Sequence, residues 1–187
     1  MSCAPAWVVA GPPGAGKSTV AGLLVAALTP PHALLEKDTM YGRFASIILA
    51  AHGRPHGERE GPWYDEHIKA HEYAAMAEVA AEIRGHGCPV MICAPYTTQI
   101  HDPLRWAELT AELGSGEVRL VWIRSDAATL RTRLTERGLA RDSEKLRRFP
   151  EFLTRIRFDA PPAVPFVEID NRGGAEPLEA QVSRIRP

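Results

Sequence analysis

The chain has 187 residues, of which 45% are hydrophobic and 24% charged, the usual composition of a globular domain rather than of a disordered or fibrous protein. Lys and Arg number 22 and Asp and Glu 23, a net charge of -1, which argues against a protein coated with positive charge for binding polyanions. No apolar run approaches the roughly 18 residues of a membrane span, and the N-terminus lacks the charged and apolar segments of a secretion signal. The three cysteines are irregularly spaced, as is typical of reduced thiols. We expect a cytoplasmic single domain over residues 1–187, either a monomer or a homodimer.

Short apolar runs alternate with helical stretches along the chain. We expect strands at 6–10, 33–35, 89–94, 118–123 and 164–169, and helices at 20–28, 40–51, 65–84, 103–113, 127–137, 143–158 and 178–185. The helix at 143–158 is expected to be interrupted at Pro150. A loop rich in Gly, Pro and His separates the second and third helices. Strands this short and continuously apolar are typical of parallel sheets that are buried on both faces. The predicted fold is therefore α/β, a three-layer sandwich around a five-stranded parallel sheet.

The segment between the first predicted strand and helix matches the pattern G-x-x-x-x-G-K-[ST] in full. Its residues are Gly11, Pro12, Pro13, Gly14, Ala15, Gly16, Lys17, Ser18 and Thr19. The glycines let the backbone curve around phosphate oxygens, so that successive N–H groups and the helix N-terminus face the anion. Lys17 would reach the β- and γ-phosphates, and the Ser18 hydroxyl would complete the shell of a Mg²⁺ ion. This segment, called the phosphate loop below, predicts binding of ATP with Mg²⁺.

Two further features accompany the phosphate loop. A short strand ends near Asp38, 21 residues after Lys17, and an arginine-rich segment follows the fourth strand. With these features the sequence resembles the P-loop small-molecule kinases, which carry an AAA-type ATP-binding domain. The group includes gluconate kinase, chloramphenicol phosphotransferase, adenylylsulfate kinase and the polynucleotide 5′-hydroxyl kinases. The resemblance implies that residues 38–72 cover the phosphate acceptor and that a small helical lid, about 126–157, closes over the nucleotide.

Asp38 is the candidate general base. At the carboxyl end of a parallel strand it would face the ligand crevice, where a carboxylate can accept the proton of an acceptor hydroxyl. An Asp at this place has that role in the kinases that the sequence resembles. Asp38 could instead cap the following helix, and Glu36 and Lys37 are weaker candidates because strand alternation places Lys37 on the opposite face. The third strand ends without an acid, which weakens an assignment as a mechanical ATPase and leaves Mg²⁺ to Ser18, phosphate oxygens and water.

Residues 119–157 hold 11 basic and five acidic side chains. Such a run is commonly a solvated helix face, but Arg also suits bidentate contacts with phosphate. Arg133 and Arg137 are four residues apart on one predicted helix, and Arg141 follows Gly138, which ends that helix. The resemblance implies that these arginines belong to the lid, with Arg133 on the nucleotide and with Arg137 and Arg141 on the phosphoryl group in transfer.

Aromatic and polar side chains surround the segment that carries the acid. They are Tyr41, Arg43, Tyr64 and His67, joined by Tyr96 after the third strand. Each could line an acceptor site or pack a loop onto the core. The predicted function is transfer of the γ-phosphate of ATP to a hydroxyl of a small molecule, such as a sugar acid, a nucleoside or an antibiotic-like natural product.

Two other functions stay open at this point. A kinase of nucleic-acid 5′-hydroxyl groups is favoured by the basic segment and opposed by the acidic remainder of the chain, so nucleic acid and membrane are not expected partners. A nucleotide-dependent binding or regulatory module is the alternative from another class. Steady ATP turnover that no acceptor stimulates would favour that module.

Overall fold

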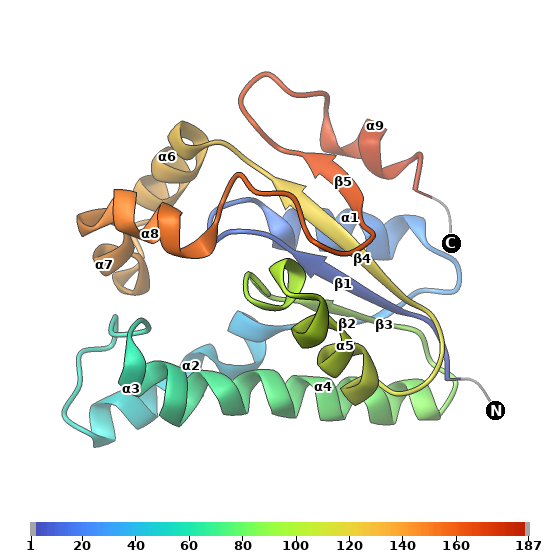
Figure 1. The fold of residues 1–187 in the computed structure, drawn as a ribbon, viewed down its shortest axis with the longest axis horizontal. Helices are drawn as coiled ribbons and strands as arrows, with labels where there is room; N and C mark the ends of the chain where they lie inside the picture. The colour runs from blue at the N-terminus through green and yellow to red at the C-terminus, as the bar shows by residue number, and fades with distance from the viewer. Residues whose placement is uncertain (1–2, 186–187) are drawn as a thin grey trace.

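The computed structural model describes residues 3–185, and five parallel strands form its central sheet (Figure 1). The strands are β1 (Ala6–Ala10), β2 (Ala33–Glu36), β3 (Val90–Cys93), β4 (Val118–Arg124) and β5 (Val167–Asp170). Their order across the sheet is β2-β3-β1-β4-β5. Val8 in the central strand faces Ile92 on one side and Leu120 on the other. The predicted α/β fold with a five-stranded parallel sheet is confirmed.

Helices cover both faces of the sheet (Figure 1). They are α1 (Lys17–Ala27), α2 (Lys37–Ala51), α3 (Pro62–Tyr64), α4 (Ala70–Gly85), α5 (Pro103–Glu112), α6 (Ala127–Arg137), α7 (Ser143–Arg147), α8 (Phe149–Ile156) and α9 (Leu178–Val182). The helices α1 and α9 lie over one face, and α4 and α5 lie over the other. Among residues 3–185, no helix is long and apolar enough to cross a membrane.

The strand β1 is buried on both of its faces, as its continuous apolar sequence predicts. Trp7 and Val9 pack with α1, whereas Val8 and Ala10 pack with α4 and α5. Every residue of β1 is at most 1% exposed, so the phosphate loop that follows it starts from a rigid position at the centre of the sheet.

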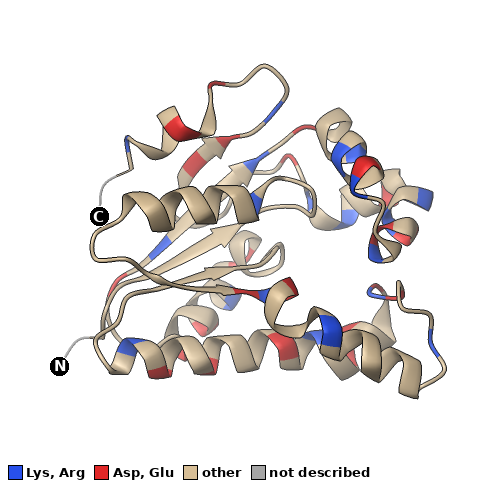
Figure 2. Ribbon diagram, turned by 180° about the vertical axis from the view of Figure 1, so that it is seen from behind, with Lys and Arg blue, Asp and Glu red and all other residues tan. Residues whose placement is uncertain are grey.

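The helices α6, α7 and α8 project together beyond the ends of the strands, opposite α2 and α3 (Figure 1). Asp126 caps α6 by accepting a hydrogen bond from the Thr129 amide at 2.8 Å. Gly138 ends α6 in a left-handed conformation with φ 60°. Lys and Arg gather on these helices (Figure 2), which are called the lid below.

Several predicted helices have other bounds in the structure. The helix predicted at 20–28 begins at Lys17, and the helix predicted at 178–185 ends at Val182. The helix predicted at 40–51 begins at Lys37, and the helix predicted at 65–84 is preceded by α3 and opens with a π-helical turn at Asp65–Lys69. The interruption predicted at Pro150 within 143–158 is present: α7 ends at Arg147 and α8 begins at Phe149. Pro150 has no N–H to donate to the preceding turn and occupies the first turn of α8.

Candidate active site

Glycines shape the phosphate loop between β1 and α1. Gly16 precedes α1 with φ 94°, a left-handed conformation, and a side chain there would collide with Asn171. Gly11 has φ 147°, and a Cβ atom at that position would lie 2.7 Å from the carbonyl oxygen of Ile123. Glycine is therefore required at these two positions by the backbone conformation and by the close approach of neighbouring protein atoms.

Lys17 and Ser18 begin α1 and face the cavity beside the loop. The Lys17 ammonium donates a hydrogen bond to the carbonyl of Pro12 at 3.0 Å, and burial lowers the pKa of Lys17. The hydroxyl of Ser18 donates to a carboxylate oxygen of Glu36, at the end of β2. Glu36 also accepts a hydrogen bond from Thr39 at 2.9 Å.

Two residues from distant elements hold the outer side of the loop. Asn171, which follows β5, donates to the carbonyl of Ala15 at 2.7 Å. Arg133 on α6 donates to the same carbonyl at 3.4 Å and to the side-chain oxygen of Asn171 at 3.0 Å. Arg133 therefore lies against the phosphate loop; its predicted contact with the nucleotide stays a prediction.

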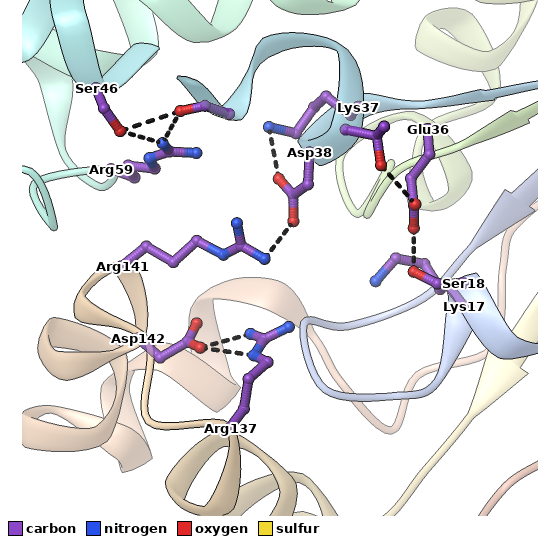
Figure 3. Close-up of polar contacts among 12 residues, drawn as sticks. Lys17, Ser18, Glu36, Lys37, Asp38, Ser46, Arg59, Arg137, Arg141 and Asp142 are labelled. Atoms are coloured by element: carbon purple, nitrogen blue, oxygen red, sulfur yellow. Dashed lines mark hydrogen bonds and ion pairs between the residues drawn. The ribbon is translucent and has the colours of Figure 1, made fainter. Parts of the chain in front are cut away.

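Asp38 lies in the first turn of α2 and is not its cap, so the capping interpretation is wrong. Glu36 is the residue that precedes the helix. The Asp38 carboxylate is 3.0 Å from a guanidinium nitrogen of Arg141 and 3.5 Å from the Lys37 ammonium (Figure 3). An acid in the first turn is also stabilised by the helix dipole.

Burial by itself would raise the pKa of the Asp38 carboxyl, but surrounding cations lower it below its ordinary value. These cations are Lys37, Arg141, Lys17 and Arg59. Asp38 is consequently ionised at neutral pH and can accept a hydrogen bond or a proton.

Lys37 does not point away from Asp38, in contrast to the prediction from strand alternation. The strand β2 ends at Glu36 and helical geometry begins at Lys37, so the alternation of a strand no longer applies. The Lys37 ammonium lies 2.9 Å from the buried carboxylate of Glu72, which also accepts a hydrogen bond from the Tyr64 hydroxyl at 3.1 Å. This buried cluster fixes the start of α2 against α4.

Contacts between the lid and the opposite wall close the cleft. In addition to the Arg141–Asp38 pair, Glu60 from the 52–61 loop pairs with Lys145 at 3.1 Å and with Arg155. Gly57 in the same loop approaches the backbone of Ala140 so closely that a Cβ atom would collide with it. The loop and the lid are therefore in direct contact.

Within the lid, Arg137 is held by the buried carboxylate of Asp142. The Nε atom of Arg137 donates to this carboxylate at 2.8 Å, and a terminal nitrogen lies 2.6 Å from the same oxygen. Asp142 is 1% exposed, so it holds the guanidinium of Arg137 in a fixed orientation beside the cavity (Figure 3).

A cavity of about 520 Å³ joins the phosphate loop, Asp38 and the lid. Of the predicted site residues, it is lined by Pro13, Gly14, Gly16, Lys17, Ser18, Thr19, Asp38, Tyr64, Arg133, Arg137 and Arg141. The remaining loop residues, Gly11, Pro12 and Ala15, form the loop backbone behind this lining. A second hollow of about 910 Å³ lies between the 55–61 segment and the lid and shares Glu60, Lys145, Phe152 and Arg155 with the first.

Four of the predicted acceptor residues do not line the cavity. Tyr41 packs against the core below the sheet, and Arg43 is exposed on α2. His67 is half exposed and stacks on Trp63 with ring centroids 4.9 Å apart. Tyr96 is 1% exposed and packs edge-on against a neighbouring tyrosine. Their roles in the structure are those of packing and surface residues.

Arg59 and Glu60 of the cavity wall were not singled out from the sequence. They come from the loop at 52–61, which lies within the segment 38–72 that was expected to cover the acceptor. Thr97 and Thr98, in the turn after β3, also line the cavity; the sequence left open whether they line the acceptor site or only form a turn. The charged run Glu58-Arg59-Glu60 inside a Gly- and Pro-rich loop was the available signal, because charges in such a loop often serve a site.

The residues beside the phosphate loop fit a magnesium ion. The hydroxyl of Ser18 and the carboxylate of Glu36 meet there, and both are hard oxygen ligands. Among the residues that the structure describes, no three His, Cys, Asp or Glu side chains gather into a metal site. This arrangement suits Mg²⁺, which keeps several waters and binds phosphate oxygens.

The AAA domain family AAA_33 matches residues 7–156, from β1 to the end of the lid. The chain belongs to this family. The match of the AAA_33 domain contains the phosphate loop, Asp38 and all three predicted lid arginines. No curated protein matches the sequence significantly.

Solved structures of P-loop kinases share the fold of this AAA_33 domain. An unliganded sugar kinase from Janibacter sp. HTCC2649 is 17% identical with a TM-score of 0.64, covering 97% of this chain and 91% of its own. The Mycobacterium tuberculosis APS kinase CysC in complex with AMPPNP and APS is 16% identical with a TM-score of 0.54, and the alignment covers 97% of this chain and 95% of the APS kinase chain. The tunicamycin resistance protein of Deinococcus radiodurans is 16% identical with a TM-score of 0.55, and the alignment covers 97% of this chain and 92% of the tunicamycin resistance protein. The predicted P-loop kinase-like fold is confirmed.

Proposed function

We propose that this AAA_33 domain is an ATP-dependent phosphotransferase that moves the γ-phosphate of ATP to a hydroxyl group of a small molecule. The observation that carries the proposal is the position of the ionised Asp38 carboxylate, which shares one cavity with Lys17 and with the lid arginines. Transfer to an alcohol needs a phosphate-binding end, a proton acceptor and cations around the transferred group, and the cavity supplies all three.

Each group has a role in this reaction. The amides of the phosphate loop, Lys17 and Arg133 bind the triphosphate. Asp38 orients the acceptor hydroxyl in line with the γ-phosphorus and takes its proton. Arg137 and Arg141 stabilise the negative charge on the phosphoryl oxygens during transfer.

Closure and metal binding complete the site. The contacts of the lid with the 52–61 loop keep water away from the γ-phosphate, which favours transfer over hydrolysis. Ser18 and Glu36 would hold the magnesium ion, whose charge offsets that of the phosphate oxygens.

The substitution Asp38→Asn tests the proposal. Asn keeps the size of the side chain but cannot take a proton, so transfer should fall by roughly 10²–10⁴-fold. ATP affinity, measured by calorimetry, should change little, because Lys17 and the loop amides are untouched. Phosphorylated products from a panel of hydroxyl compounds are measured by mass spectrometry on the same preparation.

Asp102→Asn is the matched control. Asp102 caps α5 and does not line the cavity, and Asn caps a helix about as well as Asp, so both binding and transfer should stay normal. Near-normal transfer by Asp38→Asn would refute the assignment of the base. ATP hydrolysis that no acceptor in the panel stimulates would refute the phosphotransferase and favour a regulatory nucleotide-binding module.

A further inference from the structure

Arg59 enters the cavity from the 52–61 loop and is anchored to α2 by one end of its guanidinium group. Its Nη2 atom donates to the hydroxyl of Ser46 at 2.9 Å and to the carbonyl of Gly42 (Figure 3). The guanidinium group also packs on α2 at Gly42, where a Cβ atom would stand in ordinary contact with Nη1 at 3.8 Å. The loop conformation therefore fixes where the charge of Arg59 is placed.

The other nitrogens of this guanidinium have no partner in the protein. Both Nε and Nη1 of Arg59 are shielded from solvent and lack a hydrogen-bond acceptor. A buried donor without an acceptor costs free energy, and native proteins rarely leave one unused. Two such donors on one fixed Arg that lines a cavity indicate that a ligand supplies the acceptor oxygens.

The charges around the cavity locate this ligand in the acceptor part. The acids there are already paired: Asp38 with Arg141, Glu60 with Lys145 and Arg155, and Asp65 with Lys69. Among residues 3–185, the lining cations without a carboxylate partner are Lys17, Arg133 and Arg59.

Lys17 and Arg133 belong to the nucleotide end of the cavity, where triphosphate oxygens would neutralise them. Arg59 lies on the opposite side of Asp38 from Lys17 (Figure 3), so the nucleotide that occupies the phosphate loop does not account for its charge. An oxyanion carries the geometry and the charge that a guanidinium binds best.

We propose that Arg59 binds an anionic group, a carboxylate, phosphate or sulfate, of a hydroxyl-bearing acceptor. That the anion belongs to the acceptor rests on the phosphotransferase function proposed above; the anion site itself rests on Arg59 alone. Neutral polyols and unphosphorylated nucleosides are then poor acceptors, and their acidic counterparts are good ones.

The first experiment measures anion binding without transfer. The protein is saturated with Mg²⁺ and AMPPNP, which occupies the phosphate loop, and is titrated with inorganic sulfate, phosphate or glycerate in a calorimeter. Wild type should bind at least one of these probes, and Arg59→Gln should weaken that binding by about tenfold or more, the effect expected for loss of charge-assisted hydrogen bonds. Arg54→Gln is the matched control, because Arg54 lies in the same loop, pairs with Glu58 and does not line the cavity; it should bind as wild type does.

Arg59→Gln could disturb the loop that Arg59 anchors, so AMPPNP affinity and thermal unfolding are measured for each variant. Arg59→Lys keeps the positive charge and loses the planar fork; it should fold normally and bind the anion more weakly than wild type and more tightly than Arg59→Gln. No saturable binding by wild type, or equal binding by wild type, Arg59→Gln and Arg59→Lys, would overturn the anion site.

The second experiment compares transfer to matched pairs of acceptors that differ only in charge. The pairs are glycerate and glycerol, aldonic acids and the corresponding alditols, and nucleoside monophosphates and nucleosides. The acidic member should have a kcat/KM about tenfold or more above that of the neutral one, mainly through KM, and Arg59→Gln should bring the ratio of the two kcat/KM values close to one.

The two proposals fail in different ways. In one outcome, wild type transfers phosphate to neutral acceptors with no preference for acidic ones, and Arg59→Gln does not change this transfer. That outcome overturns the anion site but leaves the proposed phosphotransferase function standing. In the other outcome, the protein binds an anion through Arg59 but transfers phosphate to no member of the panel. That outcome supports the anion site and counts against the proposed phosphotransferase function.

Discussion

Replacing Glu72 with Leu removes a carboxylate that is only 4% exposed and holds the start of α2 in place. The Lys37 ammonium then keeps only the Asp38 carboxylate, at 3.5 Å, and the buried Tyr64 hydroxyl loses its acceptor. Leaving one member of a buried ion pair uncompensated usually costs about 3–5 kcal/mol, and because Asp38 still offsets part of the Lys37 charge we expect the free energy of unfolding to fall by about 3 kcal/mol. In a chain of this size that loss lowers the melting temperature by on the order of 10 °C.

The double variant Lys37→Met/Glu72→Leu separates the ion pair from the rest of the site. It leaves no buried ammonium, so the remaining cost comes mainly from the unpaired Tyr64 hydroxyl, about 1–3 kcal/mol. The double variant should therefore be more stable than Glu72→Leu alone, although it carries one more substitution. Glu72→Gln is the control that removes the charge and keeps an acceptor for Tyr64.

Urea unfolding is measured for wild type, Lys37→Met, Glu72→Leu and the double variant, by circular dichroism and by tryptophan fluorescence. The four free energies of unfolding give the coupling energy between Lys37 and Glu72. Coincident transitions by the two probes establish that one unfolding step is being measured. If the losses of the two single variants simply add up in the double variant, the two charges do not depend on each other and the reasoning is refuted.

Three further predictions concern the loop, the core and a helix cap. Lys17→Ala should slow phosphate transfer by on the order of 10²-fold, or about 3 kcal/mol, measured as product formed per minute. Arg84 is fully buried and donates only to backbone carbonyls, so Arg84→Met should cost about 3 kcal/mol in thermal unfolding. Hydrogen bonds from Thr129 lower the pKa of Asp126 to about 2, so the stability lost in Asp126→Ala, about 1 kcal/mol at neutral pH, should shrink as the pH falls from about 4 towards 2.

Each of these has a clear opposite result. Lys17→Ala with more than half of the wild-type rate would remove the phosphate loop from catalysis. An unchanged melting temperature for Arg84→Met would mean that the carbonyls around it find other donors. The Asp126 carboxylate stabilises the fold only while it is ionised, so a difference that stays constant down to pH about 2 would contradict its role as a charged cap.

Local signals in the sequence explain why some elements were predicted to the residue. The strand at 6–10 is a continuous apolar run that ends at Gly11, and the helix at 127–137 lies between the cap Asp126 and the terminal Gly138. The start of α2 was missed because the sequence of 33–38 offers no stop between strand and helix, and only pairing with β3 fixes the end of β2 at Glu36.

The nucleotide end of the site was predictable because its residues are consecutive and its chemistry depends on backbone conformation. The acceptor end was not, because tertiary packing brings its residues together from separate elements. Lys37 meets Glu72 across 35 positions, and Arg59 reaches the cavity only because its loop rests on Gly42 and Ser46. No spacing rule in a single sequence encodes such contacts.

The contacts across the cleft differ in how strongly solvent screens them. The Arg141–Asp38 pair is partly exposed and contributes about 1 kcal/mol or less. The Lys145–Glu60 pair is more buried, with side chains 7% and 19% exposed, so salt screens it less. Opening the cleft requires both pairs to break, and added salt should therefore ease opening mainly through Arg141–Asp38.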